Sequence, residues 1–172
     1  MANGDEVMNL ANMHSNTQEE AQGDEETNVT IINYTNIGSI KGFGKASVEA
    51  REFVIPDKKY IDYFIGVETE SSGDYPQTGK TLIKLKNVEK LLSSIDSLSR
   101  ANITRDRFAF TEYQYEVDGL KIVVFNNDRG QIMFMIGTEN ISTHFTEISR
   151  LQEFRNLIQK AKMHLERARV DN

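Results

Sequence analysis

The stretch at residues 73–81 (GDYPQTGKT) has the composition that comes nearest to a phosphate-binding site. A phosphate-binding loop needs a glycine, four residues and then Gly-Lys-Ser/Thr, so that consecutive backbone N–H groups surround the phosphate. Here five residues separate Gly73 from Gly79. The residues that follow (LIKLK) favour a strand, whereas the motif needs a helix whose N-terminus faces the phosphate. We therefore expect a solvent-exposed loop between two strands and no bound cofactor.

A second glycine-rich stretch, residues 41–44 (KGFG), matches the first four positions of an RNA-recognition signature. That signature continues with aromatic residues, where this chain continues KASV, so Phe43 is the only ring left for base stacking. We favour a bend or bulge in a strand, which glycine permits. Single-stranded nucleic-acid binding through Lys41, Phe43 and Lys45 is the weaker alternative.

Cysteine and histidine chemistry is limited by composition. The chain has no cysteine, which excludes disulfides, thiolate metal sites and a cysteine nucleophile. A catalytic zinc site uses three protein ligands. His14, His144 and His164 share no ligand spacing, although His144 and His164 could approach each other beside Glu147. We expect surface or core histidines and no metal. Paired carboxylates remain open, because such a pair is defined in space rather than in sequence.

The net charge of −6 is concentrated at the N-terminus. Residues 1–28 contain seven Asp and Glu and no Lys or Arg, while the other 144 residues have a net charge of +1. The N-terminal segment also lacks aromatic residues and Ile, so it cannot bury enough apolar surface to offset the cost of ordering. We expect an acidic disordered tail at 1–28. Val7, Leu10 and Ala11 have helical spacing and could fold onto a partner.

Strand and turn signals alternate in the first half of the remaining chain. Strands are predicted at 29–34, 47–55, 60–70 and 81–85, with a turn-rich stretch around the glycines at 38–44. Asn87 is a plausible helix N-cap. After it, apolar residues at spacings of three and four predict a helix over 88–98.

The second half predicts a four-strand meander at 108–117, 120–125, 132–136 and 141–148, with a tight turn at Asp118-Gly119. The strands at 122–125 and 132–136 are apolar without alternation, which is typical of central strands covered on both faces. A long helix follows, with Ser149 and Gln152 as a predicted capping box. A shift of 63 residues superposes the apolar residues of the first strand-then-helix pattern, at 82–95, on those of the second, at 145–158. Short strand–helix junctions can share this pattern by chance, so an internal duplication is the less favoured explanation.

These elements predict an α+β fold with one mostly antiparallel sheet of about seven or eight strands, two packed helices and a C-terminal meander closed by a long helix. Residues 29–172 would form one domain. The longest apolar runs have about five residues, so we expect no membrane partner. No signal peptide is visible after Met1, from which we expect a cytoplasmic location.

Because no catalytic constellation appears, we expect a non-enzymatic module that binds a protein partner, with nucleic acid not expected. The runner-up is an enzyme or small-ligand protein whose site forms on the sheet around Tyr60, Tyr63, Tyr113 and Tyr115. Oligomeric state stays open. The candidate binding residues lie in the glycine turn, the 71–79 loop, the following strand and the basic end of the last helix. They are Lys41, Phe43, Lys45, Tyr75, Lys80, Lys160, Lys162, Arg167 and Arg169.

Overall fold

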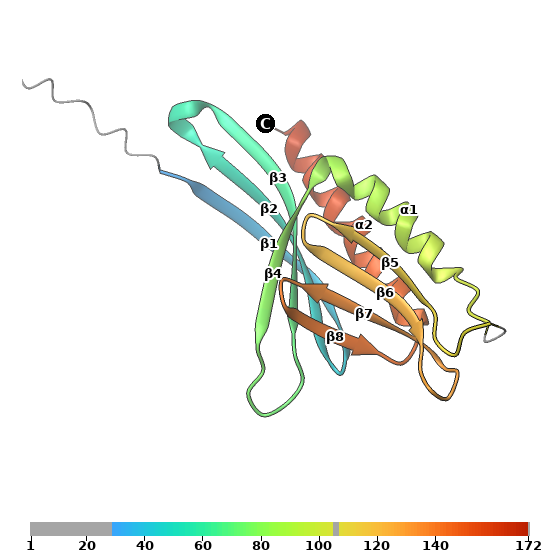
Figure 1. Cartoon of the computed structure of the whole chain (residues 1–172). Helices are drawn as coiled ribbons and strands as arrows, with labels where there is room; N and C mark the ends of the chain where they lie inside the picture. Colours follow the sequence, from blue (N-terminus) through green and yellow to red (C-terminus); the bar gives the residue numbers. More distant parts are fainter. Residues whose placement is uncertain (1–28, 105–106, 172) are drawn as a thin grey trace, which may run out of the picture.

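A computed structural model describes residues 29–104 and 107–171 of the chain, and the predicted acidic tail lies outside these residues. The chain passes twice through four strands and a helix (Figure 1). The first unit contains β1 (Ile31–Gly42), β2 (Gly44–Ile55), β3 (Tyr60–Glu70), β4 (Thr78–Lys84) and α1 (Val88–Ser99). The second contains β5 (Glu112–Val117), β6 (Leu120–Asn126), β7 (Ile132–Thr138), β8 (Ile141–Phe145) and α2 (Ser149–Val170).

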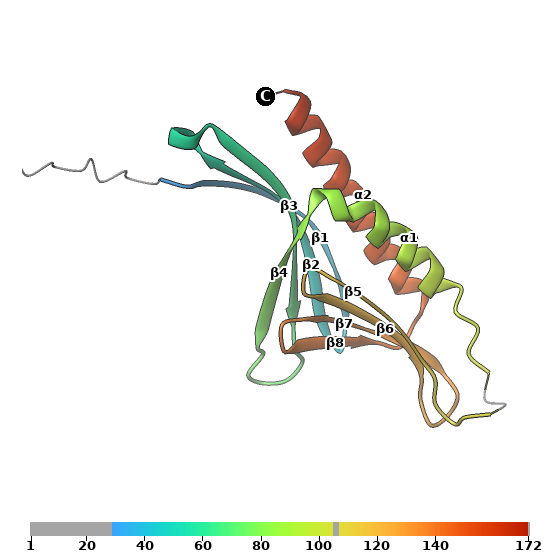
Figure 2. The same cartoon turned by 45° about the horizontal axis from the view of Figure 1, so that its top comes forward.

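The strands form two antiparallel sheets of four rather than the single sheet predicted from the sequence. Their orders are β1-β2-β3-β4 and β5-β6-β7-β8, so each strand pairs with its neighbour in sequence. After β4 the chain leaves the first sheet through α1 and begins the second, and the two sheets cross each other (Figure 2). The α+β class, the C-terminal meander and the closing helix are confirmed.

The core lies between the two sheets and the two helices. Two of its buried phenylalanine rings, Phe134 and Phe145, are stacked with their centroids 4.6 Å apart and their planes 10° from parallel. Both rings are fully buried. The other large, fully buried side chains are Phe154, Ile65, Ile83, Leu91, Ile95, Leu120, Ile122, Ile136, Leu151 and Ile158.

Hydrogen bonds between threonines join the two sheets. The Oγ1 atoms of Thr69 and Thr138 lie 2.5 Å apart, and Thr69 also donates to the Ile141 carbonyl at 3.0 Å. A Cβ atom at Gly79 would lie 2.7 Å from the Thr138 carbonyl oxygen. The glycine of the GKT sequence therefore allows one sheet to approach the other, and the whole GKT sequence lies within β4, which agrees with rejecting a phosphate-binding loop.

The tight turn predicted at Asp118-Gly119 is confirmed. Both residues have positive φ, 48° and 83°, as a two-residue turn of this kind requires. The Asp118 carboxylate accepts hydrogen bonds from the backbone N–H of Lys84, at 3.0 Å, and from the Asn87 side chain, at 2.8 Å. The turn of the second sheet therefore holds the junction between β4 and α1.

Helix capping differs from the prediction. Asn87 occupies the N-cap position of α1, but its side chain binds Asp118 instead of capping the helix. At the start of α2 the N-cap residue is Ile148, and no side chain caps the helix. The predicted capping box is wrong, because Ser149 is already inside the helix and the Gln152 amide donates to Asn156 in the next turn.

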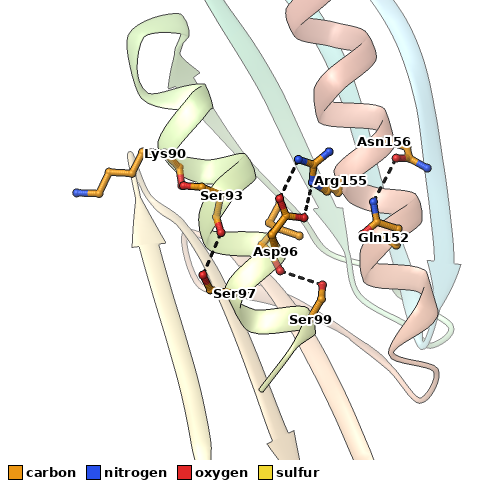
Figure 3. Close-up of polar contacts among 9 residues, drawn as sticks. Lys90, Ser93, Asp96, Ser97, Ser99, Gln152, Arg155 and Asn156 are labelled. Atoms are coloured by element: carbon orange, nitrogen blue, oxygen red, sulfur yellow. Dashed lines mark hydrogen bonds and ion pairs between the residues drawn. The ribbon is translucent and has the colours of Figure 1, made fainter. Parts of the chain in front are cut away.

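Polar side chains tie the two helices together (Figure 3). The guanidinium of Arg155 on α2 meets the Asp96 carboxylate on α1 at two points, Nη2 to Oδ2 at 2.9 Å and Nε to Oδ1 at 2.7 Å. The hydroxyls of Ser93, Ser97 and Ser99 donate to carbonyl groups three or four residues earlier in α1. These serines therefore satisfy their hydroxyls within the helix, and packing rather than propensity maintains it.

The extents of several strands also differ from prediction. β1 continues to Gly42 instead of ending at Tyr34, with a bulge between Asn36 and Gly38. A Cβ atom at Gly38 would lie 2.8 Å from Leu157 Cδ2, so the glycine lets α2 pack closely against β1. Residues 108–111 precede β5 as a loop, and β8 ends at Phe145.

β6 and β7 are the central strands of the second sheet, as predicted, but only one of their faces is fully covered. Phe134 and Ile136 point into the core, whereas Phe125, Met133 and Met135 on the opposite face are only half-buried. The expected second layer is not seen on that face in residues 29–104 and 107–171. The outer face of β6 and β7 is therefore a partly exposed hydrophobic surface.

The two helical stripes superposed by the 63-residue shift occupy equivalent places. Leu91 and Ile95 on α1 and Phe154 and Ile158 on α2 are all fully buried. The repeated order of elements agrees with that correspondence. Among the described residues, no helix has the length and apolar character needed to cross a membrane.

Candidate functional site

The first sheet extends along the end of α2 and past it, and we call this end of the sheet the sheet tip: residues 31–36 of β1, 51–55 of β2 and 60–62 of β3. Its inner part, residues 33–35 and Glu52, still borders His164 and Leu165 of α2. Ile31, Val54 and Ile61 pair in one row across the three strands, on the face that packs against the helices further along. Ile31 is 43% exposed and Ile61 is 41% exposed. Figure 2 shows the tip and the end of α2 diverging, so this row continues the core face into solvent.

The opposite, outer face of the first sheet carries an aromatic group. Phe53 and Phe64 meet edge to face with centroids 5.2 Å apart. The Arg51 guanidinium lies over the Tyr34 ring at 5.4 Å, and Arg51 pairs with Phe64 in the sheet. Ile32 beside them is 45% exposed and Tyr34 is 63% exposed. The tip therefore exposes apolar or aromatic side chains on both faces, beside the charged side chains of Arg51, Glu52 and Asp62.

A cluster of charges lies beside the aromatic group, centred on Glu49. Its carboxylate forms ion pairs with Arg51 and with Lys80 of β4, across β3. Gly66 is the residue of β3 opposite Glu49, and a Cβ atom there would lie 2.7 Å from Glu49 Oε1, so the glycine leaves room for the crossing. Burial raises the pKa of Glu49, but hydrogen bonds and charge from Lys80 and then Arg51 outweigh it and leave this pKa below its ordinary value.

The β1–β2 turn is fixed to the second sheet at Phe43. The Phe43 N–H donates to the His144 carbonyl at 2.8 Å, and the Thr143 hydroxyl donates to the Phe43 carbonyl at 2.8 Å. The Phe43 ring nevertheless stays largely exposed. Cβ atoms at Gly42 and Gly44 would lie 2.5 and 2.2 Å from backbone oxygens. These glycines are therefore explained by close packing of the turn.

The candidate lysines of this region have different surroundings. Lys41 is exposed near the turn, whereas Lys45 lies 3.8 Å from Glu70. Lys80 is bound to Glu49. Tyr75 is almost fully exposed in the loop between β3 and β4, apart from the other aromatic residues named as candidates. The structure thus brings Lys41, Phe43 and Lys45 together at one turn and leaves Tyr75 separate.

The basic end of α2 does not form one surface. With 3.6 residues per turn, Lys160 and Arg167 lie on one side of the helix and Lys162 and Arg169 on another. Lys162 donates to Glu166 at 2.8 Å and lies 2.7 Å from Glu89. The Glu166 carboxylate, followed by Glu89, raises the Lys162 pKa above its ordinary value. Lys162 is therefore occupied by structural ion pairs.

An open depression of about 490 Å³ lies where α2, α1 and the ends of β3 and β4 meet. Its charged groups are of both signs, and Lys162 forms ion pairs with Glu89 and Glu166. Such a surface offers structural ion pairs rather than a catalytic acid and base held apart. The lining residues are Asp62, Tyr63, Lys84, Leu85, Lys86, Glu89, Lys162, Glu166 and Arg169.

The tyrosines of the runner-up hypothesis belong to different places. Tyr60 donates to Asp62 at 2.8 Å at the sheet tip, and Tyr63 is buried beside the helices. Tyr113, in the second sheet, donates to the Asn102 carbonyl at 3.1 Å. Tyr115, also on β5, packs against the core. Two tyrosines thus belong to each sheet, and each is explained by its own local surroundings.

The remaining histidines are also accounted for locally. The His144 ring meets the edge of Phe125 at 6.2 Å, on the outer face of the second sheet. His164 lines a shallow depression between α2 and β1. Within residues 29–104 and 107–171, no group of three or more His, Asp or Glu side chains is placed to hold a metal ion.

Sequence reasoning missed the sheet tip, where Ile31, Ile32, Tyr34 and Phe53 make the most distinctive surface, with Phe64 next to it. The sequence contained one indication of this surface: residues 29–40, at the start of the folded part of the chain, have no charged residue and no proline. No model of a known protein family matches the chain, and no curated protein or solved structure shows significant similarity to it.

Proposed function

We propose that this chain is a non-enzymatic interaction module that holds a protein partner at the sheet tip. The observation that carries the proposal is the exposure of apolar residues on both faces of the tip. With typical areas of about 150–250 Å² per large side chain, the exposed fractions there amount to roughly 600 Å². Because this area is divided between the two faces of the sheet, each face has a patch of about 300 Å², at the lower end of the largest apolar patches on monomers, which often bind partners. The contributing residues are Ile31, Ile32, Tyr34, Tyr60 and Ile61 of the tip, and Val29 just before β1.

The charged depression supports this proposal more than an enzymatic one. It is open to solvent, and its Lys162 is held by two carboxylates rather than directed toward a substrate. An enzyme site of this size more commonly has an apolar lining with a few convergent polar groups. The runner-up hypothesis of a small-ligand site therefore has less support than a surface that binds a macromolecule.

Site-specific photocrosslinking tests the proposal in cells that make the protein. A photoreactive phenylalanine analogue replaces Tyr34 at the tip or, as the matched control, Tyr75 in the exposed loop. We expect a discrete protein adduct from position 34 and none from position 75. Adducts from position 75 alone, or from neither position, would contradict the proposal.

A second candidate function is binding of single-stranded nucleic acid on the outer face of the first sheet. The specific observation is the group of Tyr34, Phe53 and Phe64 with Arg51 among the rings. Aromatic rings and cations interleaved on an open sheet are suited to stacking bases and contacting phosphates. The acid–base pairs of Glu49 and its neighbours reduce the positive charge available there.

Fluorescence anisotropy with a labelled mixed-sequence oligonucleotide tests this second function at low salt. We expect binding that weakens with added salt and that is lost in an Arg51→Gln variant. Phe43→Ala, at the exposed end of the β1–β2 turn, shows whether the turn also takes part. No anisotropy change at low salt would exclude the second function.

A further inference from the structure

β1 is an edge strand whose outer side has no neighbouring strand in the part of the chain that the structure describes. Alternate backbone N–H and C=O groups of an edge strand point away from its only neighbour and can pair with another strand. Proteins commonly protect long edges with charged residues or proline. Residues 29–40 contain neither, and the first charge along β1 is Lys41.

The side chains beside this edge would also be covered by a second strand. Residues 31–36 are all exposed, although they lie in a regular strand paired with β2. Ile31 lies on the helix side of the sheet and Ile32 and Tyr34 on the outer side. A strand added along β1 would therefore shield apolar side chains on both faces while its backbone satisfied the free groups of the edge.

We propose that the added strand is β1 of a second copy, paired antiparallel across a two-fold axis. The two four-stranded sheets then form one continuous sheet of eight strands. This inference rests on the proposed interaction function and names the partner. A two-fold contact uses the same patch on both copies. Residues 29–40 meet this requirement, because a segment without charges opposes no like charges when it pairs with itself.

The bulge between Asn36 and Gly38 sets the register of this pairing. It limits the straight part of the edge to residues 31–36, with one or two residues before it, so Asn33 is at the centre. Asn33 then lies opposite Asn33 of the second copy, and Ile32 lies opposite Tyr34 of the second copy. The aromatic and aliphatic side chains of the outer face thereby form a mixed pair, which stabilises antiparallel sheets.

The exposed area beside the β1 edge fits a weak dimer. Val29, Ile31, Ile32 and Tyr34 expose roughly 400 Å² there, about half of the ~800 Å² that each partner buries in a standard interface. Backbone pairing along β1 adds directional hydrogen bonds to this contact. We therefore expect a dimer that dissociates on dilution rather than an obligate one.

Sedimentation velocity on the full chain tests the proposal directly. At high protein concentration we expect twice the monomer mass of 19.6 kDa, returning to the monomer mass on dilution. Ile32→Lys places a charge on the edge and should abolish the dimer, while Tyr75→Lys, in the exposed loop, should leave it unchanged. Circular dichroism confirms that both variants are folded. A wild-type chain that stays monomeric, or an Ile32→Lys chain that still dimerises, overturns the proposal.

The absence of cysteine allows a second test of the register. In the proposed pairing the two Asn33 Cα atoms lie about 4.5–5.5 Å apart, within the range that a disulfide spans. Asn33→Cys should therefore form a covalent dimer under mild oxidation. Ser39→Cys, exposed on the same strand, should not, because its two copies would be about 40 Å apart. Covalent dimers from Ser39→Cys and none from Asn33→Cys would refute the register.

The two proposals fail in different ways. A monomeric chain that gives a heterologous photoadduct at position 34 would refute self-pairing and support the interaction function. A dimer that crosslinks at Asn33→Cys, with an adduct of the chain to itself at position 34, supports both. If the chain is monomeric and position 34 gives no adduct, both are refuted.

Discussion

The contact between Asp96 and Arg155 provides a quantitative test of how the two helices are joined. The pair makes two close contacts, at 2.9 and 2.7 Å. Arg155→Met keeps most of the aliphatic stem, and Asp96→Asn keeps the shape of the carboxylate while removing its charge. The two single variants and the double variant make a double-mutant cycle with the wild type.

The expected coupling energy follows from the exposure of the two side chains. Hydrogen bonds to charged groups contribute about 1.5–3 kcal/mol when well buried, and exposed ion pairs about 0.2–1 kcal/mol. The side chains of Arg155 and Asp96 are 24% and 34% exposed, which places them between these limits. We expect a coupling of about 1–2 kcal/mol. For a chain of this length, a variant that loses about 1–2 kcal/mol of stability should show a Tm lower by roughly 2–8 °C.

Urea unfolding followed by circular dichroism measures the four free energies of unfolding. Gln152→Ala is the control, because its exposed side chain makes a 3.4 Å contact within α2 and none to α1 that the structure shows. A coupling below about 0.3 kcal/mol, the usual error of additivity, would refute the idea that this pair holds the helices together. A loss from Gln152→Ala as large as that from Arg155→Met would refute it as well.

Three further predictions concern the core, the β1–β2 turn and the charge cluster. Phe134→Ala removes a ring stacked on Phe145 and should cost about 3–5 kcal/mol in urea unfolding; a loss below 1 kcal/mol would show that the site collapses. Gly44→Ala should lower the Tm measurably, because φ is +107° and the new Cβ would lie 2.2 Å from the Glu70 carbonyl oxygen; an unchanged Tm would contradict this. Glu49→Gln should destabilise the fold at neutral pH, because the folded state lowers the pKa of Glu49 and so gains stability at pH values above 4.5, the ordinary pKa of the group. In the wild type, that stability is lost as the pH falls through the folded-state pKa. The difference between wild type and Glu49→Gln should therefore shrink below pH 4.5, and a difference that widens there would have the wrong sign.

Local patterns in the sequence predicted the helices and the sharpest turn. The apolar stripe containing Leu91 and Ile95 is buried as its spacing indicates. Asp118 and Gly119 adopt the positive φ values that a two-residue turn requires. Each of these features depends on residues a few positions apart, so the chemistry that produces it is visible in a short segment.

The division into two sheets could not be predicted in the same way. It depends on contacts such as Thr69 with Thr138, which are 69 residues apart in the chain. Gly79 makes this approach possible, but in the sequence it looked like part of a phosphate-binding motif. A strand pattern specifies which residues alternate in and out, not which strands share a sheet.

The candidate surface was only partly predictable for the same reason. Lys41, Phe43 and Lys45 are close in sequence, and the structure keeps them at one turn. Tyr34 and Phe64 come together only through the pairing of β1 and β3 with β2. That the outer part of the sheet tip lacks a covering helix depends on where α2 ends, at Val170, relative to strands formed more than a hundred residues earlier.

The attachment of Phe43 to β8 has a consequence for biosynthesis. The backbone partner of this turn is residue 144, and the Thr143 hydroxyl that supports it comes 100 positions later than Phe43. A nascent chain leaves the ribosome N-terminus first, so β1 to β4 emerge well before their anchor exists. During that interval the β1–β2 turn has no partner from β8 and is exposed to solvent. Premature termination before β8 would release a product in which this end of the first sheet lacks its hydrogen bonds to the second sheet.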